Sequence, residues 1–208
     1  MSDKSEIMVK VCGLTDVREA KYLNRYKIDF AGFVLFFPKS KRNISIEKAE
    51  EIMEVLDRNI KKVAVVVSPD EEQIGHINNS YFDYIQIHGK IEEHVLEKVE
   101  KPVLKAFNVD DMDSFARYSS NSKIAGYVFD AAEPGSGKAF DWDILKKIER
   151  DGKLFVLAGG LNPSNVKKAV DFVGPDMVDV SSGVEKADGF GKDAEKIKKF
   201  AEQVRNKF

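Results

Sequence analysis

Residues 154–183, LFVLAGGLNPSNVKKAVDFVGPDMVDVSSG, contain one complete repeat of the pattern that runs through this chain. Two short apolar runs, Leu154–Ala158 and Met177–Val180, flank an amphipathic segment. Small or polar residues follow each run: Gly159-Gly160 after the first and Ser181-Ser182-Gly183 after the second. A strand, a helix and a second, parallel strand produce this alternation.

Eight apolar runs of this kind occur in the 208 residues. They are rich in Val, Ile and Phe, as expected of strands buried on both faces. Eight parallel strands favour a closed barrel, and no Gly-x-Gly-x-x-Gly follows the first run, which argues against an open dinucleotide-binding sheet. We therefore expect an α/β protein, a (β/α)8 TIM barrel forming a single domain over 1–208, with a short polar tail at 1–6. The runs are Ile7–Cys12, Phe30–Phe36, Val63–Val67, Tyr84–Ile87, Val103–Phe107, Ile124–Phe129, Leu154–Ala158 and Met177–Val180.

Helix signals lie between the runs. Ser68-Pro69-Asp70-Glu71 predicts a capping box with proline at the first helical position, and Asn162-Pro163 predicts a second helix start of that kind. The last segment predicts a helix with one apolar stripe against the barrel, made of Ala194, Ile197, Ala201, Val204 and Phe208.

Charge and cysteine usage exclude several classes of protein. The formal net charge is −2, with Lys and Glu mixed along the chain, so we expect neither nucleic acid nor a membrane surface as a partner. The only cysteine is Cys12, which excludes an internal disulfide and favours a reducing compartment. No apolar run reaches the roughly 18 residues of a membrane span, and Met1–Glu6 does not resemble a signal peptide. We expect a cytoplasmic protein.

The turns after runs seven and eight predict a phosphate site. Glycines let the backbone approach a ligand, and exposed amides at a helix N-terminus favour an anion. The same glycines could simply make tight turns. These two loops are, however, the recurrent phosphate-binding loops of the (β/α)8 barrel. We therefore expect Gly159, Gly160, Ser181, Ser182 and Gly183 to bind phosphate.

Cys12 and Asp130 end the first and sixth runs, where a barrel places catalytic groups. A lone cysteine is more often a small buried hydrophobe, and an aspartate at this place is often only a turn residue. At the barrel mouth, however, a thiolate can act as base and a partly desolvated carboxyl can keep its proton and act as acid. We expect the positive end of a helix to lower the pKa of Cys12. A bell-shaped pH profile should follow, with Cys12 setting its acidic limb and Asp130 its basic limb.

Arg42 lies in the loop after the second run, where its guanidinium could hold a carboxylate. A solvated basic loop is the alternative. His88 could line the pocket, but His76 and His94 lie elsewhere and no metal-ligand spacing appears, so we expect no metal site. The only loop notably rich in glycine, 133–138, should lie on the same face.

Taken together, these segments resemble the phosphoribosylanthranilate isomerase family over nearly the whole chain. No single motif suffices, but the ordered series is highly specific. The matching segments are 10–15 (KVCGLT), 32–45, 86–89 (QIHG), 129–142, 158–163 (AGGLNP) and 178–185 (VDVSSGVE). Asn43 and Ala139 depart from the family's usual tyrosine and threonine, departures that concern the local shape of two loops and not the chemistry.

The resemblance implies an isomerase of tryptophan biosynthesis that converts N-(5-phosphoribosyl)anthranilate into 1-(2-carboxyphenylamino)-1-deoxyribulose 5-phosphate. Cys12 would be its general base, Asp130 its general acid and Arg42 the holder of the anthranilate carboxylate. His88 and Asp179 would also contact substrate, beside the phosphate residues named above. The resemblance implies no cofactor, and the protein would be a monomer or a homodimer.

Three alternatives differ in their catalytic groups. Other phosphosugar barrels, such as an epimerase or indole-glycerol-phosphate synthase, share the phosphate loops but lack a cysteine and aspartate pair at these strand ends. The aminoaldose isomerase of histidine biosynthesis uses two carboxylates. A non-catalytic phosphate sensor would need neither Cys12 nor Asp130.

Overall fold

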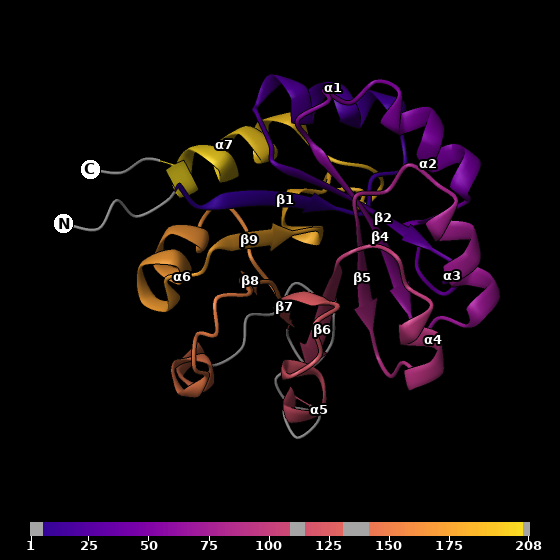
Figure 1. The fold of residues 1–208 in the computed structure, drawn as a ribbon. Helices are drawn as coiled ribbons and strands as arrows, with labels where there is room; N and C mark the ends of the chain where they lie inside the picture. Colours follow the sequence, from indigo (N-terminus) through magenta and orange to yellow (C-terminus); the bar gives the residue numbers. More distant parts are fainter. Residues whose placement is uncertain (1–5, 109–114, 131–141, 206–208) are drawn as a thin grey trace.

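The strands of this chain form one closed parallel barrel (Figure 1). The computed structural model describes residues 6–108, 115–130 and 142–205. Strand β1 (Met8–Cys12) pairs with both β2 (Phe30–Leu35) and β9 (Met177–Val180), which closes the ring. The other strands, in chain order, are β4 (Lys61–Val67), β5 (Tyr84–His88), β6 (Val103–Asn108), β7 (Ile124–Asp130) and β8 (Leu154–Leu157). The predicted eight-stranded barrel is confirmed.

A ninth strand lies outside the ring. The two residues of β3 (Asn43–Ile44) pair with Val34 and Leu35 of β2. The sequence analysis missed this strand because two residues are too few to show an alternation of apolar and polar side chains.

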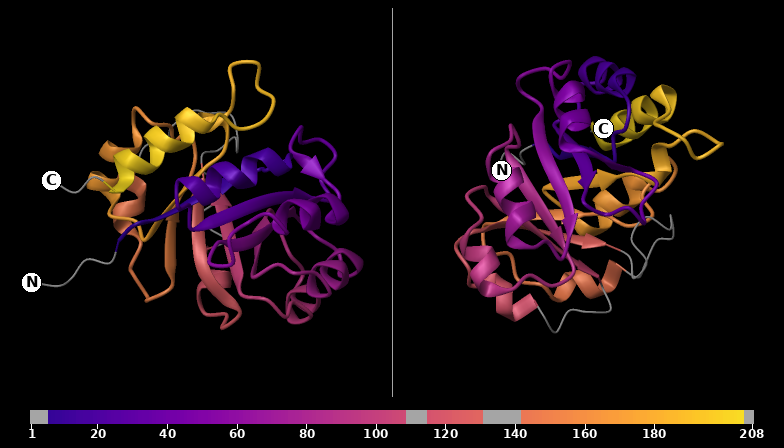
Figure 2. Two further views of the ribbon diagram at one scale, coloured as in Figure 1. Left: turned by 90° about the horizontal axis from the view of Figure 1, so that it is seen from above. Right: turned by 90° about the vertical axis from the view of Figure 1, so that its right-hand side faces the viewer.

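Helices follow most strands and cover the barrel. They are α1 (Val17–Arg25), α2 (Ile46–Met53), α3 (Glu71–Asn78), α4 (Glu93–Glu97), α5 (Phe115–Ser119), α6 (Val166–Val173) and α7 (Ala194–Arg205), with 3₁₀ helices η2 (Trp142–Lys147) and η3 (Ser182–Val184). Figure 2 shows α7 beside α1 on the outside of the barrel. On α7, Ile197, Ala201 and Val204 are buried as predicted, together with Phe200. The predicted Phe208 lies outside the described residues.

Both predicted helix starts are wrong by a few residues. Helix α3 is capped by Asp70, whose side chain accepts from the backbone of Gln73, so Ser68 is not the cap and proline precedes the helix. Helix α6 begins after Asn165 and not at Asn162. Proline at the first helical position was the misleading signal, since Pro69 and Pro163 belong here to the turn before the helix.

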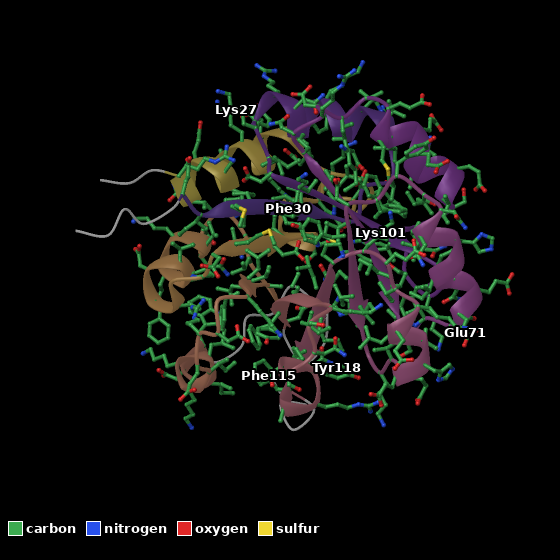
Figure 3. The ribbon with its side chains drawn as sticks, in the orientation of Figure 1. Lys27, Phe30, Glu71, Lys101, Phe115 and Tyr118 are labelled. Atoms are coloured by element: carbon green, nitrogen blue, oxygen red, sulfur yellow. The ribbon has the colours of Figure 1, made fainter. Side chains whose placement is uncertain are left out.

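Two apolar layers stabilise the barrel. Alternate strand residues fill its interior, among them Phe30, Val63, Leu104 and Val156. The opposite faces of the strands pack against the helices in a second, larger cluster. Figure 3 shows the difference, with Phe30 among the strands and Phe115 and Tyr118 at the outer helix α5. Among the helices within the described ranges, none has the length and apolar character to cross a membrane.

Candidate active site

A cavity of about 440 Å³ opens at the C-terminal ends of the strands. It brings together nine of the ten residues expected to act on substrate: Cys12, Arg42, His88, Asp130, Gly159, Gly160, Asp179, Ser181 and Ser182. Parallel strands all end on one face, so side chains that are far apart in sequence meet there. Val34, Phe37, Val65 and Val67 add apolar wall. The glycine-rich segment 133–138 lies outside the described residues.

Cys12 and Asp130 are each 8% exposed and line the same cavity from β1 and β7. The backbone carbonyl of Cys12 accepts a hydrogen bond of 2.9 Å from Ser181 Oγ, which ties the end of β1 to the turn after β9. Burial raises the pKa of the Cys12 thiol, although Lys10 opposes the shift. The expected lowering of this pKa is therefore wrong, because burial outweighs the nearby positive charges.

Asp179 reaches the cavity from β9 and is paired with a residue that the sequence analysis did not single out. Lys10, on β1, donates a 2.7 Å hydrogen bond from Nζ to Asp179 Oδ2, and both side chains are buried. Asp179 Oδ1 has no partner among the described residues. One carboxylate oxygen is thus held by the protein, and the other is a buried acceptor that the described residues leave unsatisfied.

Arg42 is 15% exposed and belongs to the segment just before β3. Its Nε donates to Glu185 Oε1 at 2.5 Å, which leaves the two terminal nitrogens as the groups that can form a bidentate contact with a carboxylate. Gly13 makes room for this arginine, since a Cβ there would lie 2.5 Å from Arg42 Cδ. The solvated basic loop is therefore excluded for Arg42.

Glu185 is a second residue that the sequence analysis missed. Besides Arg42, it accepts from Lys41 at 2.9 Å and from the buried Lys192 at 3.3 Å. Burial opposes its ionisation, but these three cations outweigh that effect and lower the pKa of Glu185 to about 2. Its position two residues after Ser181-Ser182-Gly183 could have marked Glu185 as a candidate site residue. Nothing in the sequence, however, pairs it with Arg42.

The two predicted phosphate turns touch each other. Gly159 and Gly160 both have positive φ, of 81° and 66°, which other residues adopt with strain. Their amides donate to no group within 6–108, 115–130 and 142–205, so they can receive an anion. Gly183 does not line the cavity; a Cβ there would lie 2.0 Å from the carbonyl oxygen of Leu161. The missing Cβ at Gly183 lets the two turns pack closely, and its expected contact with phosphate stays a prediction.

His88, at the end of β5, is uncharged. Burial, together with the charges of Lys10 and Lys105, lowers the pKa of His88 to about 3. Its Nε2 accepts a 2.9 Å hydrogen bond from the side-chain amide of Gln86. Gln86 Oε1 is buried and has no partner in the described part of the chain. Both side chains line the cavity and offer neutral polar groups to a ligand.

No group of three or more His, Cys, Asp and Glu side chains in the described ranges is arranged to hold a metal ion.

Comparison with known proteins points to one family. Residues 9–203 match the family model described as N-(5'phosphoribosyl)anthranilate (PRA) isomerase. The N-(5'-phosphoribosyl)anthranilate isomerase of Clostridium kluyveri is 43% identical over 208 residues, covering 96% of this chain and 98% of that protein.

Solved structures agree. The phosphoribosyl anthranilate isomerase of Thermotoga maritima superposes with a TM-score of 0.85 at 35% identity, covering 97% of this chain and 100% of that one. A phosphoribosyl anthranilate isomerase in complex with reduced 1-(o-carboxyphenylamino)-1-deoxyribulose 5-phosphate gives a TM-score of 0.80 at 32% identity, with coverages of 97% and 100%.

Proposed function

Because this chain belongs to the phosphoribosylanthranilate isomerase family, we propose that it uses Cys12 as general base and Asp130 as general acid. The protein is an isomerase of tryptophan biosynthesis that acts on N-(5'-phosphoribosyl)anthranilate. The observation that carries the proposed roles is that both side chains line one cavity between two anion-binding groups. A phosphate sensor would need only the turns.

Strand order supports the placement of substrate. Strand β1, which ends at Cys12, pairs on one side with β2, whose following loop leads to Arg42, and on the other with β9, whose turn is part of the phosphate site. A substrate with its carboxylate at Arg42 and its phosphate at Gly159 and Gly160 would cross the mouth past Cys12. Holding both anionic ends orients the reacting carbon beside the sulfur, which is where positioning contributes to rate.

The chemistry consists of proton transfers. Asp130 protonates the furanose oxygen, the ring opens and an imine forms between C1′ and the anthranilate nitrogen. Cys12 then removes the proton from C2′, giving an enolamine that takes up a proton at C1′ and becomes the ketone product. Throughout these steps, an ion pair between Arg42 and the anthranilate carboxylate holds one end of the substrate. The free amides of Gly159 and Gly160 hold the phosphate at the other end.

The proposed roles can be tested by turnover. Fluorescence of freshly prepared phosphoribosylanthranilate should fall with the wild type and remain constant with Cys12→Ala and Asp130→Asn. Both variants should still bind the reduced product analogue, because neither side chain belongs to the phosphate or carboxylate contacts. Near wild-type turnover in a folded Cys12→Ala variant would show that the thiol is only a buried side chain.

The partner and location of this chain are also proposals. Cys12 as the only cysteine favours a reducing, cytoplasmic compartment. The protein would act as a monomer or a homodimer on a small phosphorylated molecule. One of the similar structures is described as monomers derived from a dimeric isomerase of Thermotoga maritima, and sedimentation of this chain would decide between the two states.

A further inference from the structure

Lys10 is a fully buried lysine inside the barrel. It precedes Cys12 by two residues on β1, so both side chains point to the same, inner face of the strand. None of its surface is exposed. The catalytic scheme above does not use this residue. A buried ammonium group is costly unless it is paired, so its presence one layer below the cavity requires an explanation.

The ammonium group of Lys10 lies between Asp179 and Cys12. It donates to Asp179 Oδ2 at 2.7 Å, and its charge favours the thiolate of Cys12. Gly32 on β2 makes this arrangement possible. A Cβ at Gly32 would lie 2.9 Å from Cys12 Sγ and 3.1 Å from Lys10 Nζ, so the two atoms converge over the glycine.

Lys10 stays charged in this position. Burial opposes its charge, but Asp179 and Cys12 outweigh burial and raise the pKa of Lys10 above its usual value. The Cys12 sulfur therefore has the positively charged Lys10 as its neighbour on the inner face of β1. Because burial disfavours the thiolate of Cys12, this cation is the neighbouring group on β1 that can offset the cost of forming it.

We propose that Lys10 is a positioning residue for the general base: held by Asp179, its ammonium group orients Cys12 Sγ and stabilises the thiolate. This inference rests on the proposed role of Cys12 as base. Of the two carboxylate oxygens of Asp179, Oδ2 fixes Lys10, and the buried Oδ1 has no partner among the described residues.

Other charges also act on the sulfur. Asp179 on β9 opposes the thiolate, and Lys192, in the segment before α7, favours it. Arg42, His88 and Asp130 line the cavity across the mouth. From β2, Gly32 and Val34 bring no charge. Removing Lys10 should therefore make thiolate formation harder, and the remaining carboxylate of Asp179 should add to the effect.

Alkylation of the thiol measures this directly, without substrate. Cys12 is the only cysteine, so uptake of one iodoacetamide group, followed by mass spectrometry, reports its thiolate alone. For Lys10→Met we expect the midpoint of the rate against pH to move to higher pH, with a rate at pH 7 about tenfold or more below that of the wild type. An unchanged or lower midpoint in the folded variant would overturn the proposal.

Two further variants keep the test decisive. Lys10→Met leaves the buried Asp179 unpaired and can lose its fold, so the pair Asp179→Asn and Lys10→Met/Asp179→Asn should be compared in the same way. The alkylation midpoint of the double variant should lie at higher pH than that of Asp179→Asn; equal midpoints would contradict the role of Lys10.

The matched control is Lys105→Met, which removes another buried strand lysine. Its Nζ lies over the rings of Phe107 and Tyr118, on the helix side of β6. It should leave the midpoint unchanged.

Turnover distinguishes positioning from a purely structural role. In Lys10→Met, kcat should fall at neutral pH and stay level up to a higher pH than in the wild type before its basic fall, while KM changes little. Equal loss of kcat at all pH values, with an unchanged alkylation profile, would mean that Lys10 only supports the fold. If the wild type is alkylated as expected but does not turn over phosphoribosylanthranilate, the proposed function fails while the coupling of Lys10 to Cys12 stands.

Discussion

Glu185 Oε1 accepts the Nε hydrogen bond of Arg42 at 2.5 Å, across 143 residues of chain. The carboxylate side chain is 7% exposed and also binds Lys41 and Lys192. Such a partner restricts the orientation of the guanidinium, and Arg42 lines the cavity. Glu185 would thus belong to the proposed carboxylate site without contacting substrate.

The first prediction concerns this pair. Arg42→Ala should remove a charge-assisted bidentate contact worth roughly 1.5–3 kcal/mol, so KM should rise by about ten- to a hundredfold. Glu185→Gln should raise KM by a smaller factor, because the arginine remains but is less well oriented. In both variants kcat should change little. Steady-state kinetics checks this, and an unchanged KM with a large fall in stability would show that the pair serves only the fold.

The second prediction concerns the pH dependence of kcat/KM. In the proposed mechanism, the active form needs Cys12 as thiolate and Asp130 as acid. Burial places the pKa of Cys12 above its usual value, and an ordinary carboxyl titrates near 3.9. Between the two pKa values, the gain of thiolate and the loss of acid cancel, so kcat/KM is level. Above the pKa of Cys12, the fraction of thiolate no longer increases while the fraction of protonated Asp130 still decreases, so kcat/KM falls.

Cys12 therefore sets the basic limb of the bell and Asp130 the acidic limb, the reverse of the assignment made from sequence. Cys12→Ser should lower kcat by about 10²–10⁴ and move the basic limb out of the measurable range. In Asp130→Asn the residual kcat/KM should rise with pH up to the pKa of Cys12 and then stay level, because the fall on the basic side comes from loss of the Asp130 proton. A basic limb that is unchanged in Cys12→Ser would assign it to another group.

The fold could be predicted from the sequence because buried parallel strands leave a strong apolar signal. Met177–Val180 was predicted with both bounds correct, and each of the other runs differs from its strand by one or two residues at one end only. Helix starts were less certain, since Pro69 and Pro163 are compatible with both a turn and a first helical turn. The two-residue strand β3 leaves no periodic signal.

The site was predicted less completely, for a physical reason. Residues at strand ends could be identified one strand at a time, but pairs between strands depend on register. Lys10 lies opposite Asp179 in the pairing of β1 with β9. Each is a charged residue within an apolar run, which is the signal that could have identified them, because a charge buried in a strand needs a partner. No such signal joins Glu185 to Arg42.

The third prediction is that His88 remains neutral. Burial first, and then the nearby lysines, lower its pKa to about 3, so the ring should not titrate between pH 5 and 8. Nitrogen NMR of histidine-labelled protein checks this, with the exposed His76 and His94 assigned by substitution and used as references. A titration of His88 near 6.5, the ordinary histidine value, would contradict the buried, neutral ring.

The last prediction concerns the contact between the two phosphate turns. A Cβ at Gly183 would lie 2.0 Å from Leu161 O and 2.9 Å from Asn162 Cβ, and backbone atoms at this distance must move. Gly183→Ala should therefore displace the turn after β8 from the turn after β9. We expect a loss of about 1–3 kcal/mol in the free energy of unfolding, as for other overpacked sites, together with weaker competition by inorganic phosphate.

Gly75→Ala is the matched control. Gly75 lies within α3, and a Cβ there meets no atom within 4 Å. Alanine is the better helix former, so this variant should gain up to about 1 kcal/mol and bind phosphate as the wild type does. Urea unfolding and phosphate inhibition would be measured on both variants. If Gly183→Ala retained wild-type stability and phosphate inhibition, the turns would adapt to the added methyl group, and close packing between them would not be what forms the phosphate site.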